Sequence, residues 1–196
     1  MAEPTRARIL VAEDEAIIRL DLVETLREAG YDVVAAVGDG AAAVERATAL
    51  RPDLVILDVA MPVLDGLAAA EQIVSGDIAP VVMLTAFSQR ELVHRATEAG
   101  ALGYLVKPFN PQELVATIEV ALARARQMSQ LTQEIADLSE RLEARIAIDR
   151  AKPVLMATLG ITEPEAFRWI QKAAMDQRCS MRDVADVLLS GTAAGS

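Results

Sequence analysis

Residues 54–66 read Leu-Val-Ile-Leu-Asp-Val-Ala-Met-Pro-Val-Leu-Asp-Gly, and this stretch decides the fold. The four branched apolar residues from Leu54 to Leu57 are typical of a strand that is buried on both faces of a sheet. Asp58 follows this strand directly, and Asp65-Gly66 is typical of a tight turn that leads into a helix. The stretch therefore predicts a buried strand that ends in a carboxylate.

The same pattern recurs on both sides of this stretch. Four more short apolar runs occur at 9–12, 33–37, 81–84 and 102–106. Amphipathic stretches with helical spacing lie between the runs, at 17–29, 41–50, 67–74 and 92–99. A further helix is expected to begin at Asn110, because Pro111 and Glu113 provide the usual start signals. Five alternations of strand and helix predict an α/β fold whose parallel sheet has helices on both faces.

Polar side chains stand where the predicted strands end. Glu13 and Asp14 follow the first strand, Asp58 the third, Thr85 the fourth and Lys107 the fifth. The carboxyl ends of parallel strands meet at one edge of the sheet, where ligands bind. Three clustered carboxylates repel one another, and Mg²⁺ relieves that repulsion. With a lysine and a hydroxyl to hold anionic oxygens, the pattern predicts phosphoryl transfer to an aspartate.

The C-terminal part of the sequence contains only helical patterns. Five apolar residues spaced alternately by three and four positions form a heptad seam, namely Met128, Leu131, Ile135, Leu138 and Leu142. Pro153 is expected to kink or break this helix near Lys152, because proline removes a backbone donor. Two more helices are predicted to begin with capping boxes, Thr162 to Glu165 and Ser180 to Asp183. The pattern indicates a small three-helix module.

Charge separates the two parts of the chain. The 196 residues carry a net charge of −10, and all of it lies in residues 1–120, which hold 9 basic and 19 acidic residues. Residues 121–196 are neutral overall, and residues 141–182 carry +3. One cysteine and one histidine exclude an intrachain disulfide and a structural zinc site. The longest uncharged run, 78–89, is too short to span a bilayer, so we expect a cytoplasmic protein.

The strand-end residues resemble those of a known family. Residues 57–66, together with Glu13-Asp14, Thr85-Ala86 and Lys107-Pro108-Phe109, resemble the signature of response-regulator receiver domains over residues 7–125. The resemblance implies a flavodoxin-like fold with strand order 2-1-3-4-5. It also implies that a histidine kinase phosphorylates Asp58.

The resemblance assigns roles to single residues. Asp14, Asp58 and the backbone carbonyl of Ala60 are implied to bind Mg²⁺. Glu13 stands where the family more often has Asp, and it is expected to act mainly through water. Lys107 is implied to pair with the phosphoryl group, while Thr85 bonds to it and moves inward together with Tyr104. A haloacid-dehalogenase-like phosphatase also uses an aspartate and Mg²⁺, but it usually needs a second Asp where this chain has Ala60.

The C-terminal module resembles a second family. Residues 145–156, 165–169, 173–175 and 180–185 resemble the ANTAR domain, and the match extends over about 132–191. That family consists of three-helix RNA-binding modules that promote transcription antitermination. Charge and helix face select the residues expected to contact RNA, with an aromatic ring for base stacking: Lys152, Arg168, Trp169, Lys172, Arg178 and Arg182. The opposite face, which includes Phe167, is expected to be buried.

Together these patterns predict a response regulator and not an enzyme. The expected divisions are a receiver at 1–125, a helical linker at 126–142, an ANTAR-like domain at 132–191 and a tail at 192–196. Phosphorylation is expected to pair two copies through the heptad seam, and the pair is expected to bind RNA hairpins in nascent transcripts. Two alternatives stay open: a phosphorylation-switched protein adaptor without nucleic-acid binding, and a DNA-binding protein.

Overall fold

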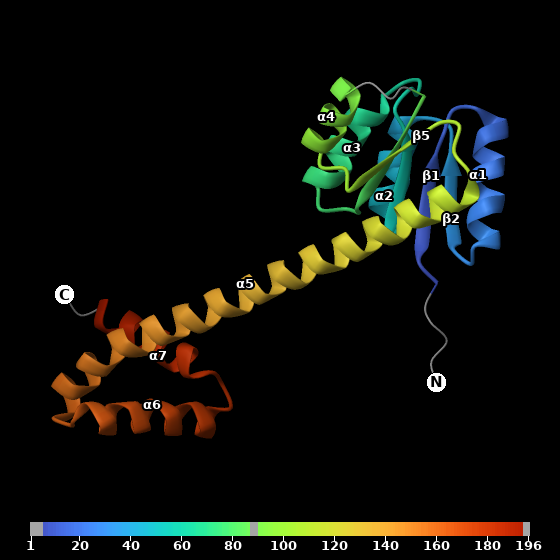
Figure 1. Ribbon diagram of the computed structural model, residues 1–196. Coiled ribbons are helices and arrows are strands. Elements are labelled where there is room, and N and C mark those ends of the chain that lie inside the picture. Colours follow the sequence, from blue (N-terminus) through green and yellow to red (C-terminus); the bar gives the residue numbers. More distant parts are fainter. Residues whose placement is uncertain (1–5, 87–89, 194–196) are drawn as a thin grey trace. The chain divides into compact units, whose positions relative to one another are not determined.

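The computed structural model describes residues 6–86 and 90–193 and divides into two compact units, Met1–Met128 and Ser129–Ser196. The first unit contains a five-stranded parallel sheet in the order β2-β1-β3-β4-β5 (Figure 1). This is the order that the receiver resemblance implies, so the predicted fold class is confirmed.

The elements of this unit follow the sequence pattern closely. The strands are β1 (Arg8–Ala12), β2 (Asp32–Val37), β3 (Leu54–Asp58), β4 (Val81–Thr85) and β5 (Gly103–Val106). The helices are α1 (Ala16–Glu28), α2 (Gly40–Leu50), α3 (Gly66–Ser75), α4 (Arg90–Glu98) and α5 (Pro111–Leu159), of which α5 continues into the second unit. Their ends lie within two residues of the predicted ends, apart from the C-terminal end of α5.

Alternating side chains place a separate apolar core on each face of the sheet. Ile9 and Val11 of β1 belong to the core that α1 and α5 cover, whereas Leu10 and Ala12 belong to the core under α2, α3 and α4. Strands buried on both faces must be apolar almost throughout. This is why the strands appear in the sequence as uninterrupted apolar runs that end in polar residues.

The Asp65-Gly66 turn holds the loop after β3 in place. The Asp65 carboxylate accepts a hydrogen bond of 2.8 Å from the Ala68 N–H and caps the N-terminus of α3. A Cβ at Gly66 would lie 1.8 Å from the Asp58 carbonyl oxygen. Only glycine therefore allows the start of α3 to approach the residue that ends β3 so closely.

The second unit is a three-helix module with its own core. It is formed by the C-terminal part of α5, by α6 (Glu163–Gln177) and by α7 (Met181–Ala193). Its largest contributors are Leu155 and Ile170, packed with small and branched residues from all three helices. Both predicted capping boxes are present, with hydrogen bonds between Thr162 and Glu165 and between Ser180 and Asp183.

The structure corrects three expectations for this unit. Helix α5 continues through Pro153 to Leu159, so it does not break near Lys152, which was one of the two outcomes predicted at this proline. Pro153 is exposed while Leu155 is buried, and burial of the opposite face offsets the roughly 3 kcal/mol that an internal proline costs. Phe167, expected in the core, is 42% exposed. The core-facing side of α6 is formed by Ala166, Ile170 and Ala174, and Phe167 lies next to that side.

The third correction concerns the C-terminus. Helix α7 extends to Ala193, two residues into the predicted tail, and residues 194–196 lie outside the described part of the chain. Within residues 6–86 and 90–193, no helix combines the length and the apolar character needed to cross a membrane.

Candidate functional site

Three carboxylates gather at the carboxyl edge of the sheet. Glu13 and Asp14 follow β1, and Asp58 is the last residue of β3, the strand that pairs with β1. One oxygen atom of each carboxylate lies within 4.8 Å of the others. Glu13 and Asp58 are buried, whereas Asp14 is exposed. The cluster therefore has a buried base and one carboxylate open to solvent.

Lys107 from the end of β5 joins this cluster. Its Nζ lies 2.6 Å from Glu13 Oε2 and 2.9 Å from Asp58 Oδ2. Burial lowers the pKa of Lys107, but its contacts with the two carboxylates outweigh burial and raise that pKa. Burial raises the pKa of Glu13, and the Lys107 ammonium opposes this rise. A partly buried cation and two buried carboxylates thus form one electrostatic unit.

The donor set fits a hard divalent cation. Although Glu13 Oε2 is close to the Lys107 ammonium, this buried oxygen has no hydrogen bond of suitable geometry within the described residues. Three carboxylates that can each place an oxygen within 4.8 Å of the others are the kind of ligands that Mg²⁺ prefers. The residues present therefore fit the cation that the family resemblance implies.

The other predicted site residues lie around this edge. Thr85 ends β4 and is buried, and its carbonyl oxygen accepts a hydrogen bond of 2.8 Å from the Lys107 N–H. Ala60 is exposed in the loop that follows β3. Neighbouring strands thus bring Asp58, Thr85 and Lys107 together from positions far apart in the sequence.

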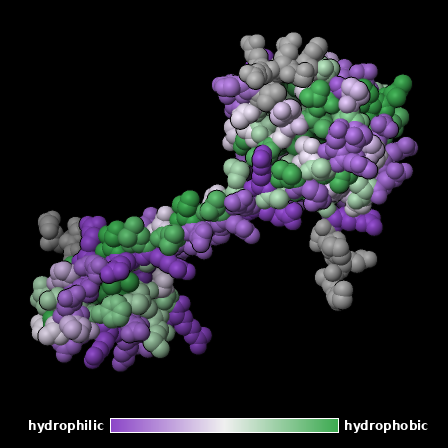
Figure 2. Space-filling model, in the orientation of Figure 1, coloured by the Kyte–Doolittle hydropathy of each residue, from purple (hydrophilic) through white to green (hydrophobic). Residues whose placement is uncertain are grey.

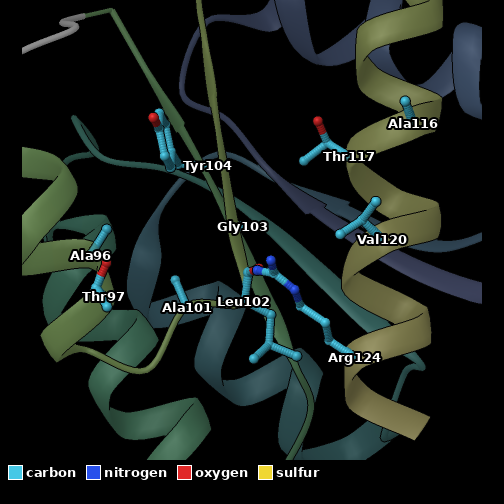
Figure 3. A pocket seen from close by; sticks show the side chains of 10 residues that line it. All are labelled: Ala96, Thr97, Ala101, Leu102, Gly103, Tyr104, Ala116, Thr117, Val120 and Arg124. Atoms are coloured by element: carbon cyan, nitrogen blue, oxygen red, sulfur yellow. The ribbon is translucent and has the colours of Figure 1, made fainter. Parts of the chain in front are cut away.

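Tyr104 of β5 lies on the surface of this unit and is 48% exposed. It lines a pocket of about 450 Å³ between α4, β5 and α5, shown in Figure 3. Thr97 lies on the α4 side of this pocket, and Thr117 and Val120 lie on the α5 side. The predicted switch tyrosine is thus in an outward position, beside an open space.

Arg19 of α1 was not predicted as a site residue. Its guanidinium group donates hydrogen bonds to the backbone carbonyls of Glu13 and Asp14, the latter over 3.3 Å. These bonds hold the β1–α1 loop that carries both acids. A lone arginine within an amphipathic helix gives no sequence signal for this positioning role.

On α6, a cationic and aromatic face is exposed. Arg168, Trp169 and Lys172 share the side opposite the core, and Trp169 is 42% exposed. Arg178 follows at the C-terminal end of the helix. Within the described residues, Arg168, Lys172 and Arg178 make no ion pair with a carboxylate. These cations are therefore available to an external anion.

The two remaining predicted RNA-contact residues are engaged within the module. Lys152 Nζ lies 2.7 Å from both Asp149 Oδ1 and Glu163 Oε1, which connects α5 to the start of α6. These contacts raise the pKa of Lys152. Arg182 Nη2 lies 3.0 Å from Glu143 Oε2 and connects α7 to α5. Sequence reasoning grouped these two cations with the α6 cations, but their partners indicate a structural role.

The heptad seam is exposed in the single chain. Each of its five residues, from Met128 to Leu142, is at least half exposed. Figure 2 shows apolar side chains on the surface along the middle part of α5. A strip of this kind on one helix is the geometry that a coiled coil buries.

Comparisons with known proteins agree with both halves of this description. Residues 9–119 match the family model for the response regulator receiver domain, and residues 136–189 match the model for the ANTAR domain. The transcriptional regulatory protein PdtaR of Mycobacterium tuberculosis is 57% identical over 182 residues, which cover 93% of this chain and 89% of that protein.

Solved receiver structures are similar to the first unit, and two of them serve as examples. The signal receiver domain of the NarL response regulator from M. tuberculosis has a TM-score of 0.60 and 31% identity, over 61% of this chain and 98% of that one. The CheX–CheY–BeF3–Mg²⁺ complex from Borrelia burgdorferi has a TM-score of 0.55 and 25% identity, over 57% of this chain and 86% of that one.

Proposed function

The chain belongs to the response regulators, with a receiver domain followed by an ANTAR domain, and from this premise we propose a phosphorylation-controlled RNA-binding antiterminator. The observation that carries the proposal is the cluster of Glu13, Asp14, Asp58 and Lys107 at one edge of the sheet. We infer the same divisions that the sequence predicts, with the receiver at 1–125, the linker at 126–142 and the RNA-binding module at 132–191.

The first step is phosphoryl transfer to Asp58. An oxygen of Asp58 attacks the phosphorus of a kinase phosphohistidine, so that an O–P bond forms as the N–P bond breaks. Glu13, Asp14, Asp58 and the Ala60 carbonyl would hold Mg²⁺, which neutralises charge on the transferring phosphoryl oxygens. The CheY complex similar to the receiver contains Mg²⁺, which supports this choice of cation.

Lys107 and Thr85 then bind oxygens of the new phosphoryl group. Lys107 is already 2.9 Å from Asp58, so its ammonium can exchange a carboxylate partner for a phosphoryl oxygen. Thr85 then donates its hydroxyl to another phosphoryl oxygen and moves toward Asp58. Tyr104, which is exposed before phosphorylation, moves inward in the space that Thr85 leaves.

The output is proposed to be pairing through the heptad seam. Two copies would bury their seams against each other and bring two ANTAR domains together. Each domain offers Arg168, Trp169 and Lys172 for one RNA hairpin loop. Two weak contacts then act as one strong contact, because tethering raises the effective concentration of the second. Bound RNA no longer forms the terminator, and transcription continues.

One experiment tests the whole sequence of events. The full chain is incubated with acetyl phosphate and Mg²⁺, and its mass, its oligomeric state and its retention of hairpin RNA are measured. The wild type should gain one phosphoryl group, dimerise and retain more RNA, whereas Asp58→Ala should do none of these. A phosphorylated Asp58→Ala protein would remove Asp58 as the acceptor.

A protein adaptor is the second candidate, and the ion pairs of Lys152 and Arg182 favour it, because they leave fewer cations for RNA. Salt distinguishes the two candidates. RNA binding through phosphate contacts weakens steeply as salt concentration rises. Binding of a protein through the apolar seam changes little.

A further inference from the structure

A basic pocket lies at the N-terminal ends of the receiver strands, whereas the proposed phosphorylation site lies at their C-terminal ends. Its volume is about 570 Å³, and it is lined by Arg6, Arg8, Arg27, Tyr31, Asp32 and Val33. β1 begins at Arg8 and β2 at Asp32, so the pocket is at the amino edge of these parallel strands. Asp58 stands at the carboxyl edge, and the proposed function makes no use of this second pocket.

The pocket concentrates positive charge in an acidic domain. Three of the nine basic residues within 1–120 line it, although that part of the chain has a net charge of −10. Within the described residues, none of these three guanidinium groups lies within ion-pair distance of a carboxylate. Three unpaired like charges around one cavity repel one another, so an anion between them would be stabilised.

Hydrogen bonds to residues outside the pocket hold two of its lining residues, Tyr31 and Arg8, in place. The Tyr31 side chain is buried, and its hydroxyl donates a hydrogen bond of 2.6 Å to Glu119 Oε1. The Arg8 N–H donates to Asp53 Oδ2 over 2.7 Å, and Arg8 Nη1 donates to the Arg51 carbonyl over 3.1 Å. Arg6 and Arg27 are exposed and make no such contact within the described residues, so their side chains are free to close on a ligand.

We propose that this pocket binds a nucleoside polyphosphate. Its volume is within the range of roughly 300–1,000 Å³ that is usual for small-molecule sites. Guanidinium groups match the paired oxygens of phosphates, and several of them suit a chain of phosphates better than a single anion. Asp32 would repel a bare polyphosphate, but its carboxylate accepts hydrogen bonds from ribose hydroxyls. Arginine and aspartate at one cavity thus fit the two parts of a nucleotide.

Calorimetric titration of the full chain tests the assignment. The ligands are ATP, tripolyphosphate and adenosine, in a chelating buffer without Mg²⁺. We expect ATP to bind more tightly than tripolyphosphate and adenosine not to bind. The double variant Arg6→Gln with Arg27→Gln should weaken ATP binding by at least about tenfold, because it removes two charge-assisted contacts. Asp32→Asn should improve tripolyphosphate binding relative to ATP.

A control variant removes the same number of charges elsewhere on the receiver. Arg46→Gln with Arg95→Gln changes its surface outside the pocket and should bind ATP as the wild type does. Equal weakening in this control, absence of ATP binding at millimolar concentration, or equal affinity for ATP and tripolyphosphate would overturn the assignment. All variants should still accept a phosphoryl group from acetyl phosphate, which confirms folding independently of the pocket.

Discussion

At the scale of single residues, Lys107 connects the two buried carboxylates of the proposed phosphorylation site. It lies 2.6 Å from Glu13 and 2.9 Å from Asp58, and both acids are buried. Two adjacent buried carboxylates cannot both stay charged without a cation nearby. In the free protein Lys107 supplies that charge, and Mg²⁺ would share the task when it binds. Glu13 stands where the family more often has the shorter Asp, and its side chain contacts Lys107.

The first prediction concerns Lys107→Gln. Losing the ammonium leaves two buried carboxylates without a cation, so the free energy of unfolding should fall by about 3 kcal/mol in Mg²⁺-free buffer. Added Mg²⁺ should raise the Tm of this variant more than that of the wild type, because the metal replaces the missing charge. Differential scanning calorimetry measures both effects.

The matched control is Lys172→Gln on the exposed face of α6. It should leave the Tm and the response to Mg²⁺ unchanged, because Lys172 makes no ion pair within the described residues. If Mg²⁺ stabilises Lys107→Gln no more than it stabilises the wild type, the shared role of lysine and metal is wrong.

At the scale of elements, the second unit depends on its helix ends. Glu165 accepts hydrogen bonds of 2.8 Å and 2.7 Å from the N–H and hydroxyl of Thr162, and Asp183 accepts them from Ser180. The backbone and hydroxyl donors of Thr162 lower the pKa of Glu165, and the hydroxyl and N–H of Ser180 lower the pKa of Asp183. Both caps are therefore strongest when the carboxylates are charged.

The second prediction is a loss of stability in acid. A carboxylate whose pKa is lowered by folding stabilises the folded state above its ordinary pKa, here 4.5 for Glu165, and loses that effect as pH falls. The Tm should decrease as pH falls below about 4.5. In Glu165→Gln the Tm should fall less between neutral and acidic pH, because the titrating carboxylate is gone. Its Tm at neutral pH should be slightly below that of the wild type. Circular dichroism melts from pH 7 to pH 3 measure this, with Asp176→Asn as the control that keeps the wild-type profile.

The third prediction concerns the heptad seam of α5. Leu131→Glu with Leu138→Glu places like charges where two seams would meet, so the phosphorylated protein should stay monomeric. Uptake of phosphate should be unchanged, because the seam makes no part of the Asp58 site. Sedimentation velocity before and after addition of acetyl phosphate measures the oligomeric state.

Gln130→Glu with Ala136→Glu adds the same charge on the opposite side of α5 and serves as the control. This pair should dimerise on phosphorylation as the wild type does. Dimerisation of the seam variant to the same extent would show that pairing uses another surface.

At the scale of the whole molecule, charge is distributed unevenly between the N-terminal and C-terminal parts of the chain. The receiver part carries the entire net charge of −10, while residues 141–182 carry +3. If the second unit binds RNA as proposed, the acidic receiver would reduce its non-specific attraction to RNA, because the net charge of the chain governs long-range approach. The unphosphorylated chain is thus expected to bind RNA weakly.

The fourth prediction is that deletion of residues 1–120 raises affinity for hairpin RNA at low salt. The gain should shrink as salt concentration rises, because screening removes long-range repulsion. Filter-binding titrations at two salt concentrations measure it. Unchanged or weaker binding by the shortened chain would reject electrostatic restraint by the receiver.

The local sequence pattern was sufficient to predict most of the helices and strands of this protein. The five apolar runs, the helical spacing between them and the capping boxes at Thr162 and Ser180 all depend on residues close together in the chain. Asp58, Thr85 and Lys107 could be assigned to one edge because parallel strands place their carboxyl ends together. The sequence by itself therefore determined the fold class and the acidic site.

Only the tertiary structure decided what depends on contacts between distant segments. It showed that Lys152 and Arg182 have carboxylate partners, that α5 continues past Pro153, and that Phe167 is exposed. It also assembled the basic pocket from Arg6, Arg27 and their neighbours. The physical reason is that periodicity encodes which face of an element is apolar, but not which side chain of another element meets it. Ion pairs, close backbone approaches and cavities arise only when the elements pack.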